Sequence, residues 1–278
     1  MTNSATVPDT GGTPSANWSL AWREHLLRSG LEANLRRAGV PEEAFWQRFG
    51  SWTETIESSG YPGGLLKRVL ELVHPADYVL DIGSGAGSYA IPIARIASHV
   101  TAVEPSPVQA SRLESNVETA GLTNVSILHS RWDDIAASEV GNHDVVLAAF
   151  CFQMHDIRAA IEAMCRAARR SLILIHAASH DLTEIFRRLF GIEPGPNYLY
   201  LQGVLRTLGY VPEVELVSRT YAVPLETQLE ILSYNPGLTG SQCEQLRNHL
   251  ESEGRLLSDD GKVLLERTNT AAFMHVAF

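Results

Sequence analysis

The most constraining feature of this sequence is an apolar run that ends in an acid and three alternating glycines. Residues 79–88 read Val-Leu-Asp-Ile-Gly-Ser-Gly-Ala-Gly-Ser. A short apolar run that breaks into glycines is typical of a buried parallel strand that turns sharply into a helix. Only glycine lets a ligand lie directly against such a turn, because any side chain would occupy the space. The pattern therefore predicts a ligand site at the end of a strand.

A nicotinamide-binding fold is the nearest alternative for these glycines. Its fingerprint Gly-x-Gly-x-x-Gly needs a small third residue five positions after the first glycine. Gly83 and Gly85 fit, but the next glycine is Gly87 and the required position holds Ser88. Asp81 lies two residues before the first glycine and has no place in that fingerprint. A carboxylate there suits an ammonium group and would repel a pyrophosphate.

A second acid follows at an informative distance. Residues 98–103 are predicted to form a strand that ends on Glu104, which lies 21 residues after Gly83. In dinucleotide folds an acid about 20 residues after the glycines binds the ribose hydroxyls. Taken together, this stretch resembles motif I and the next strand of the class I (Rossmann-like) S-adenosylmethionine-dependent methyltransferases, small-molecule type, whose motif reads acid-x-Gly-x-Gly-x-Gly.

The resemblance implies S-adenosyl-L-methionine as the cofactor and gives roles to individual residues. Asp81 would meet the cofactor's amino group, directly or through water, and Glu104 would accept both ribose hydroxyls. Pro105 would flank the adenine. The residues that would lie against the methionine part are Gly83, Ser84 and Gly85.

The loop after the third expected strand departs from the family pattern. Such families often place an Asp there for the adenine amino group, whereas the usual place holds Arg131 here. A shift of two positions lets Asp133 take that role, with Trp132 over the adenine ring or offering its backbone N–H. The alternative is an ordinary polar loop in which Asp134 caps a turn.

Tyr61 and Gly63 precede the glycine motif, in the stretch Gly60-Tyr61-Pro62-Gly63-Gly64. A glycine turn next to a helix start supplies N–H donors for an anion. Proteins of the resembling class often close over the cofactor carboxylate at this point. A plain hinge explains the same residues equally well.

The alternation of strands and helices predicts the fold class. We expect an α/β, doubly wound, mostly parallel seven-stranded sheet with an antiparallel last strand, plus an N-terminal helical extension and helical insertions. The expected units are a disordered tail at 1–17, a helical extension or lid at 18–60, and a methyltransferase domain at 61–278 with insertions at about 181–209 and 225–255. The expected strands are 78–82, 98–103, 125–128, 143–150, 171–176, 213–223 and a last one near 271–278.

The bulk composition limits the partners. A net charge of −10 disfavours nucleic acid, because proteins that grip phosphates usually show a basic face. No apolar run approaches the roughly 18 residues that span a bilayer, so we expect no membrane and a cytoplasmic location. The three cysteines have no metal-type spacing, and no metal is expected. The oligomeric state does not follow from the sequence.

The segment 144–156 carries the evidence on the methyl acceptor. It lacks the Asn/Asp-Pro-Pro-aromatic sequence of enzymes that methylate an exocyclic or side-chain amide nitrogen, and Cys151 lacks the preceding proline of RNA cytosine-C5 enzymes. What remains resembles the small-molecule methyltransferases, so we expect a small acceptor, aromatic or uncharged.

Gln153 and Met154 replace the paired histidines of the small-molecule methyltransferases, which leaves the adjacent His155 as the candidate base. A histidine at a helix start without a catalytic role is the alternative, and His129, His176 and His180 are weaker candidates.

Two further functions stay open. A methyltransferase fold can be kept as a non-catalytic regulatory or assembly module, although the intact glycines and Glu104 argue against this. Methylation of RNA or protein is the other possibility. Four of the five tryptophans fall in residues 18–60, where they either pack helices against the core or form a lid over the acceptor.

Overall fold

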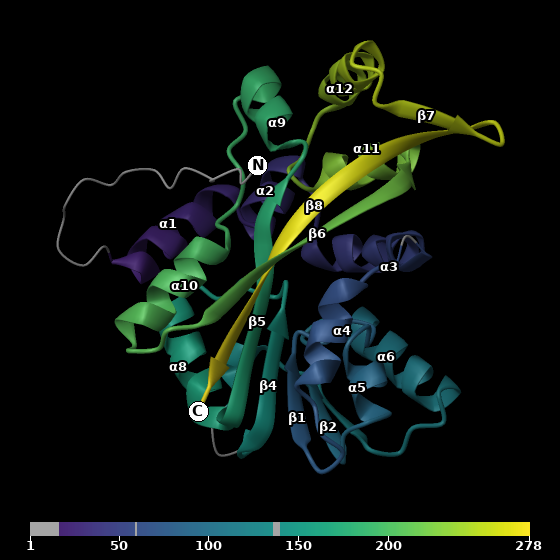
Figure 1. Ribbon diagram of the computed structural model, residues 1–278. Helices are drawn as coiled ribbons and strands as arrows, with labels where there is room; N and C mark the ends of the chain where they lie inside the picture. The colour runs from purple at the N-terminus through teal and green to yellow at the C-terminus, as the bar shows by residue number, and fades with distance from the viewer. Residues whose placement is uncertain (1–16, 59, 136–139) are drawn as a thin grey trace.

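A twisted sheet of eight strands runs through the protein, as the computed structural model in Figure 1 shows. The structure describes residues 17–58, 60–135 and 140–278. The tail expected over 1–17 lies outside these residues except for Asn17, whose side chain accepts a hydrogen bond from the Leu20 N–H at 3.1 Å and caps the first helix. No helix in the described part of the chain is both long and apolar enough to cross a membrane.

The sheet has the order β3-β2-β1-β4-β5-β8-β6, with β7 pairing with β8. Strands β1 to β5 are parallel, and β8 lies antiparallel between β5 and β6. The mostly parallel fold with an antiparallel final strand is thus confirmed, and β7 is one strand more than expected. The strands are β1 (Tyr78–Ile82), β2 (His99–Val103), β3 (Val125–Leu128), β4 (His143–Ala149), β5 (Ala168–His180), β6 (Glu213–Pro224), β7 (Leu256–Asp259) and β8 (Lys262–Ala277).

Helices cover both faces of the sheet (Figure 1). One face packs against α4 (Gly64–Glu71), α5 (Ala90–Ala94) and α6 (Pro107–Thr119), and the other against α1 (Trp18–Ser29), α8 (Ile157–Ala167) and α10 (Tyr198–Thr207). The remaining helices gather beyond the carboxyl ends of the parallel strands: α2 (Leu31–Ala38), α3 (Glu42–Ser58), α9 (Thr183–Phe190), α11 (Leu225–Tyr234) and α12 (Gly240–Ser252).

Three strands continue well past the point where the others stop. β4 ends at Ala149, which pairs with Ile175, but β5 runs on to His180. Both β6 and β8 extend beside it, with His180 paired to Asn269 and Asn269 paired to Arg219. The expected bounds of 171–176 and 271–278 were therefore too short. The extension forms a wall that rises above the carboxyl edge of the sheet.

The N-terminal extension is fixed to the core by its tryptophans. Trp22 is fully buried, and its indole N–H donates to the Met154 carbonyl at 2.9 Å. Trp18 lies over Gly203 of α10, where a Cβ would come within 2.3 Å of the indole ring. Close packing of this kind leaves no room for added volume.

The seam between α1 and α10 gives a stability prediction. Gly203→Ala should lower the free energy of unfolding by about 1–3 kcal/mol, because the new methyl overpacks the Trp18 contact. The matched control is Gly240→Ala at the start of α12, where a Cβ meets nothing within 4 Å. That variant should change the stability by less than about 1 kcal/mol. Urea denaturation of both variants checks this, and equal stabilities would show that the seam is not tightly packed.

Candidate cofactor and acceptor site

The three glycines of the turn have different roles. All have positive φ, at +69° for Gly83, +55° for Gly85 and +99° for Gly87. A Cβ on Gly83 would lie 2.2 Å from Cβ of Cys151, and one on Gly87 would lie 2.6 Å from Leu113. Only Gly85 faces open space, with nothing within 4 Å of an added Cβ. The close approach of a ligand therefore falls on Gly85, while the other two serve packing.

Asp81 lies buried at the end of β1, just before this turn. Its Oδ2 has no hydrogen-bond partner among the described residues. Burial raises the pKa of this carboxyl to about 7, and the nearby negative charge of Glu104 adds to the shift. Because the folded pKa lies above the unfolded one, ionisation of Asp81 destabilises the ligand-free fold as the pH rises from about 4 to about 7. An ammonium group would supply the missing donor and the missing charge.

Glu104 is buried directly after β2, two residues past Ala102, which is the register partner of Asp81. One carboxylate oxygen accepts from the Gly85 N–H and the other from the Ser106 N–H, each at 2.8 Å. Burial raises the pKa of Glu104, and these two hydrogen bonds oppose the shift. A carboxylate offers about four lone-pair sites, so each oxygen can still accept a ligand hydroxyl. This geometry suits two neighbouring ribose hydroxyls.

The aromatic rings beside the turn bring the pre-motif segment to the site. Tyr61 lies 6.3 Å from the Tyr89 ring and 6.3 Å from the Phe150 ring. Gly63 precedes α4 with φ +53° and lines the same cavity. Phe150 has a φ of +55°, which is unusual for a bulky residue and more frequent at functional sites. Sequence reasoning missed Phe150, and its place directly after a buried strand was the available signal.

The two expected adenine-loop residues lie on the cavity wall in different settings. Trp132 is buried, and its indole N–H donates to the Ala160 carbonyl at 3.2 Å, so the ring also packs against α8. Asp133 is exposed, and partial burial raises the pKa of its carboxyl. Pro105 is exposed on the same cavity. The structure brings these residues together, and their contacts with adenine stay a prediction.

Most of these residues line one large cavity of about 1420 Å³, although the buried Asp81 is not among its lining residues. The lining includes the turn residues Gly83, Ser84 and Gly85 and parts of the tall wall of β5, β6 and β8. Residues of α1, α2, α3, α9 and α11 also line it. Ser84 Oγ is buried without a partner among the described residues. The unsatisfied Asp81 and Ser84 atoms and the open space at Gly85 fit the cofactor that the sequence predicts.

The histidines are placed differently from the sequence expectation. His155 has a half-exposed side chain, lies 3.8 Å from Glu32 and is not among the residues that line the cavity. His176 and His180 do line it. His176 Nε2 donates to the Pro196 carbonyl at 2.9 Å, which leaves Nδ1 as a buried lone pair without a partner in the described structure. Burial lowers the pKa of both cavity histidines to about 4, so both are neutral near pH 7.

Other side chains raised by the sequence have structural surroundings. Burial strongly raises the pKa of the Cys151 thiol against Gly83, which suits packing better than nucleophilic attack. Of the N-terminal tryptophans, only Trp46 lines the cavity. Trp18 and Trp22 pack against Tyr200 of α10 instead. Within the described residues, no group of three or more His, Cys, Asp or Glu side chains could hold a metal ion.

Comparison with known proteins agrees with this geometry. Residues 79–172 match the family described as methyltransferase domain. An uncharacterized protein of Haemophilus influenzae is 31% identical over 147 residues, which cover 51% of this chain and 54% of that protein. Ribosomal RNA small subunit methyltransferase G of Mycobacterium sp. (strain JLS) is 31% identical over 121 residues, which cover 43% of this chain and 54% of that protein. The chain spans about half the length of the curated relatives it matches.

The fold also matches a solved structure. The YcgJ protein of Bacillus subtilis superposes with a TM-score of 0.55 at 15% identity, covering 77% of this chain and 97% of that one. At this identity the likeness concerns the fold alone. The fold, the glycine turn with its two acids and the family match agree: residues 79–172 form a methyltransferase domain, and the cofactor of such a domain is S-adenosyl-L-methionine.

Asp81 gives a prediction for cofactor binding. Near pH 6.5 the Asp81 carboxyl is largely protonated, because its pKa is about 7, whereas a cofactor amine is already charged. The ammonium should lower that pKa, so binding should release roughly half a proton or more per cofactor. Calorimetry in buffers of different ionisation enthalpy measures this release. Asp81→Asn should abolish it and weaken binding, while Asp260→Asn in the β7–β8 turn should leave both unchanged. Equal proton release by the Asp81 variant would contradict the assignment.

Proposed function

We propose that this protein transfers a methyl group from S-adenosyl-L-methionine to a small-molecule acceptor by in-line displacement. The proposal places the cofactor along Asp81, Gly85 and Glu104, with the acceptor toward the wall of β5, β6 and β8. The bound cofactor would supply a methyl group on a good leaving group. The protein's contribution would be alignment and exclusion of water.

The main support for a small-molecule acceptor is the position of the helices around the cavity. Leu31 and Asn34 of α2, Trp46 of α3, Phe186 of α9 and Ile231 of α11 all line it. These helices lie beyond the carboxyl edge of the sheet, where the acceptor must approach (Figure 1). A small molecule can enter such a cavity, whereas a folded RNA would need the helices to move apart.

His176 is better placed than His155 to contact the acceptor. His176 lines the cavity, and its Nδ1 is a hydrogen-bond acceptor without a partner among the described residues, because Nε2 already donates to the Pro196 carbonyl. The rings of Trp22 and Phe152 lie 5.8 Å and 5.1 Å from its ring and hold it in place. With its pKa near 4, His176 would orient a hydroxyl or amine through a hydrogen bond and remain a weak base.

An RNA acceptor is the second candidate, because a matching relative is a ribosomal RNA methyltransferase. The net charge of −10 opposes it. A regulatory module without catalysis is the third. It has no need of a buried, unsatisfied acid such as Asp81, which costs stability in the ligand-free fold.

Labelling decides among these functions. The protein is incubated with deuterated-methyl cofactor and either a metabolite extract or isolated ribosomal subunits, and the products are analysed by mass spectrometry. We expect a labelled small molecule and no labelled RNA. Label confined to RNA would overturn the small-molecule proposal. Cofactor binding without label in any fraction would favour the regulatory module.

The two histidines give a paired prediction on that labelled product. His176→Asn should lower kcat by about 10² while cofactor affinity stays the same, because the hydrogen bond that orients the acceptor is lost. His155→Ala should leave kcat unchanged, since its side chain does not line the cavity. If the His155 variant is slow and the His176 variant is fully active, His155 is the base, as expected from the sequence.

A further inference from the structure

Arg219 is the most unusual charge in the cavity lining. It lies on β6 opposite Asn269 of β8, on the wall above the carboxyl edge. Its Nη1 is buried and has no hydrogen-bond partner among the described residues. A guanidinium cannot become neutral at any ordinary pH. Burying such a charge without a partner is costly, so a partner from outside the chain is expected.

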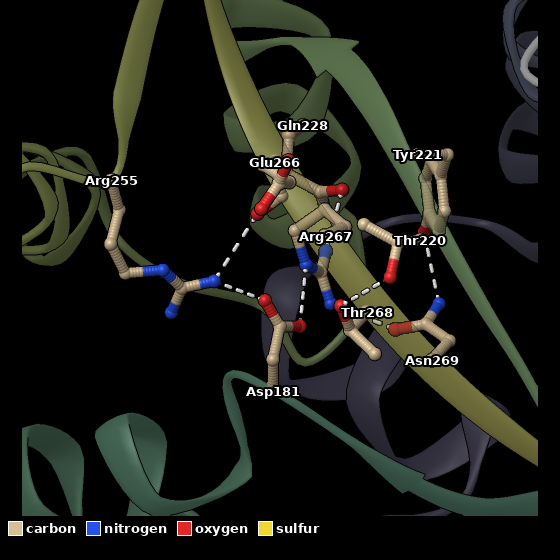
Figure 2. A network of polar contacts seen from close by, with 9 residues as sticks. All are labelled: Asp181, Thr220, Tyr221, Gln228, Arg255, Glu266, Arg267, Thr268 and Asn269. Carbon is tan, nitrogen blue, oxygen red and sulfur yellow. Dashed lines mark hydrogen bonds and ion pairs between the residues drawn. The ribbon is translucent and has the colours of Figure 1, made fainter.

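The other arginines named near this wall each have a carboxylate partner. Arg267 donates through Nε to Asp181 at 2.8 Å and through Nη1 to Gln228 at 2.7 Å (Figure 2). Arg255 shares the same Asp181 carboxylate. Arg187, a further arginine of the lining, pairs with Glu193. Within the described residues, no carboxylate lies within 4 Å of the Arg219 guanidinium, which therefore leaves an excess positive charge on the cavity wall.

The Arg219 guanidinium is also held in place. It lies over the Tyr221 ring at 4.2 Å and over the Tyr61 ring at 5.6 Å. The Tyr221 hydroxyl accepts from the Asn269 side chain at 2.9 Å, and Asn269 in turn accepts from Arg267 (Figure 2). The network around Asp181 thus fixes the ring against which the guanidinium packs. A cation held against two rings, with Nη1 still without a hydrogen-bond partner, can bind an anion at little cost in ordering.

We propose that Arg219 binds a carboxylate group of a ligand in the cavity. A single guanidinium balances one negative charge, and its planar fork matches the two oxygens of a carboxylate. This rests on the proposed function, because the carboxylate belongs either to the methionine part of the cofactor or to the acceptor. If it belongs to the acceptor, the acceptor is a carboxylic acid and not the uncharged molecule expected from the sequence.

The position of Arg219 permits both sources. Through Tyr61 it is linked to Tyr89 and Phe150, which stand beside the glycine turn. Asp81 and Arg219 would then meet the amino and carboxylate groups of one amino acid. Through Tyr221 and Asn269 it is linked to the rest of its own wall of β5, β6 and β8, toward which the acceptor would lie.

Pairs of charged and neutral ligands test the proposal and separate the sources. Calorimetry compares S-adenosylmethionine with its decarboxylated analogue, which lacks only the carboxylate. Thermal shift compares benzoate with benzamide, with and without S-adenosylhomocysteine. Each pair is measured on the wild type, Arg219→Met and Arg219→Lys. The control is Arg68→Met, because Arg68 is exposed on α4 and pairs with Glu215 outside the cavity. Circular dichroism confirms that each variant is folded, and the lysine variant keeps the charge if the methionine variant does not fold.

The results distinguish a carboxylate of the cofactor from a carboxylate of the acceptor. If the carboxylate is the cofactor's, the wild type should prefer S-adenosylmethionine by about tenfold or more, and Arg219→Met should lose that preference. If it is the acceptor's, only the preference for benzoate should be lost in this variant. Whichever preference for the charged ligand Arg219→Met loses, Arg219→Lys should retain in part, and Arg68→Met should retain it in full. The proposal is overturned if Arg219→Met keeps every preference of the wild type, or if the wild type shows none. Failure of the wild type to bind S-adenosylmethionine would overturn the proposed function, and the benzoate pair would still decide on Arg219.

Discussion

The site depends on two carboxylates that are buried side by side without enough hydrogen-bond donors. β1 and β2 are parallel neighbours, with Asp81 one residue before the end of β1 and Glu104 directly after β2, so the backbone brings the two acids to the same edge of the sheet. Glu104 is partly satisfied by two backbone N–H groups, but Asp81 keeps an unpaired oxygen. The negative charge of Glu104 makes ionisation of the neighbouring Asp81 carboxyl less favourable. A cation near Asp81 and hydroxyls near Glu104 remove both penalties, and this is the pattern of a sulfonium amino acid joined to a ribose.

The wall of β5, β6 and β8 adds a positive charge to the cavity. Glu104 at the turn contributes a negative charge to the cavity lining, and Arg219 on the wall contributes a positive one. A cavity with separated charges orients a dipolar or zwitterionic ligand before any close contact forms. The same wall needs the network around Asp181, because Arg267 and Arg255 are both drawn to one carboxylate and fix β8 where it passes the cavity (Figure 2). The long strands β5, β6 and β8 thus line the site and are also held in position by the network around Asp181.

The sequence predicted the parallel core well because its signals are local. The strand at 78–82 and the strand at 125–128 have the expected bounds, since apolar runs and glycine stops lie within a few residues of each other. The long extensions of β5 and β8 were missed because residues 177–180 are small or polar and residues 266–270 are polar or charged, which leaves only a short apolar run at 263–265. These residues become strand through pairing with distant segments, which is tertiary context. Arg219 was invisible for the same reason: nothing near it in the sequence shows that its guanidinium would be buried without a carboxylate.

The histidines show how burial changes the chemistry that a sequence suggests. His155 was the natural candidate for a base because imidazole titrates near neutrality, but its exposed position leaves it outside the cavity. The histidines inside the cavity are kept neutral by the same burial that excludes water, with pKa values of about 4. Transfer from a sulfonium disperses positive charge and requires little proton transfer when the acceptor is already nucleophilic. A cavity with neutral hydrogen-bond acceptors therefore suits this reaction better than one with a charged imidazole, which would repel the sulfonium.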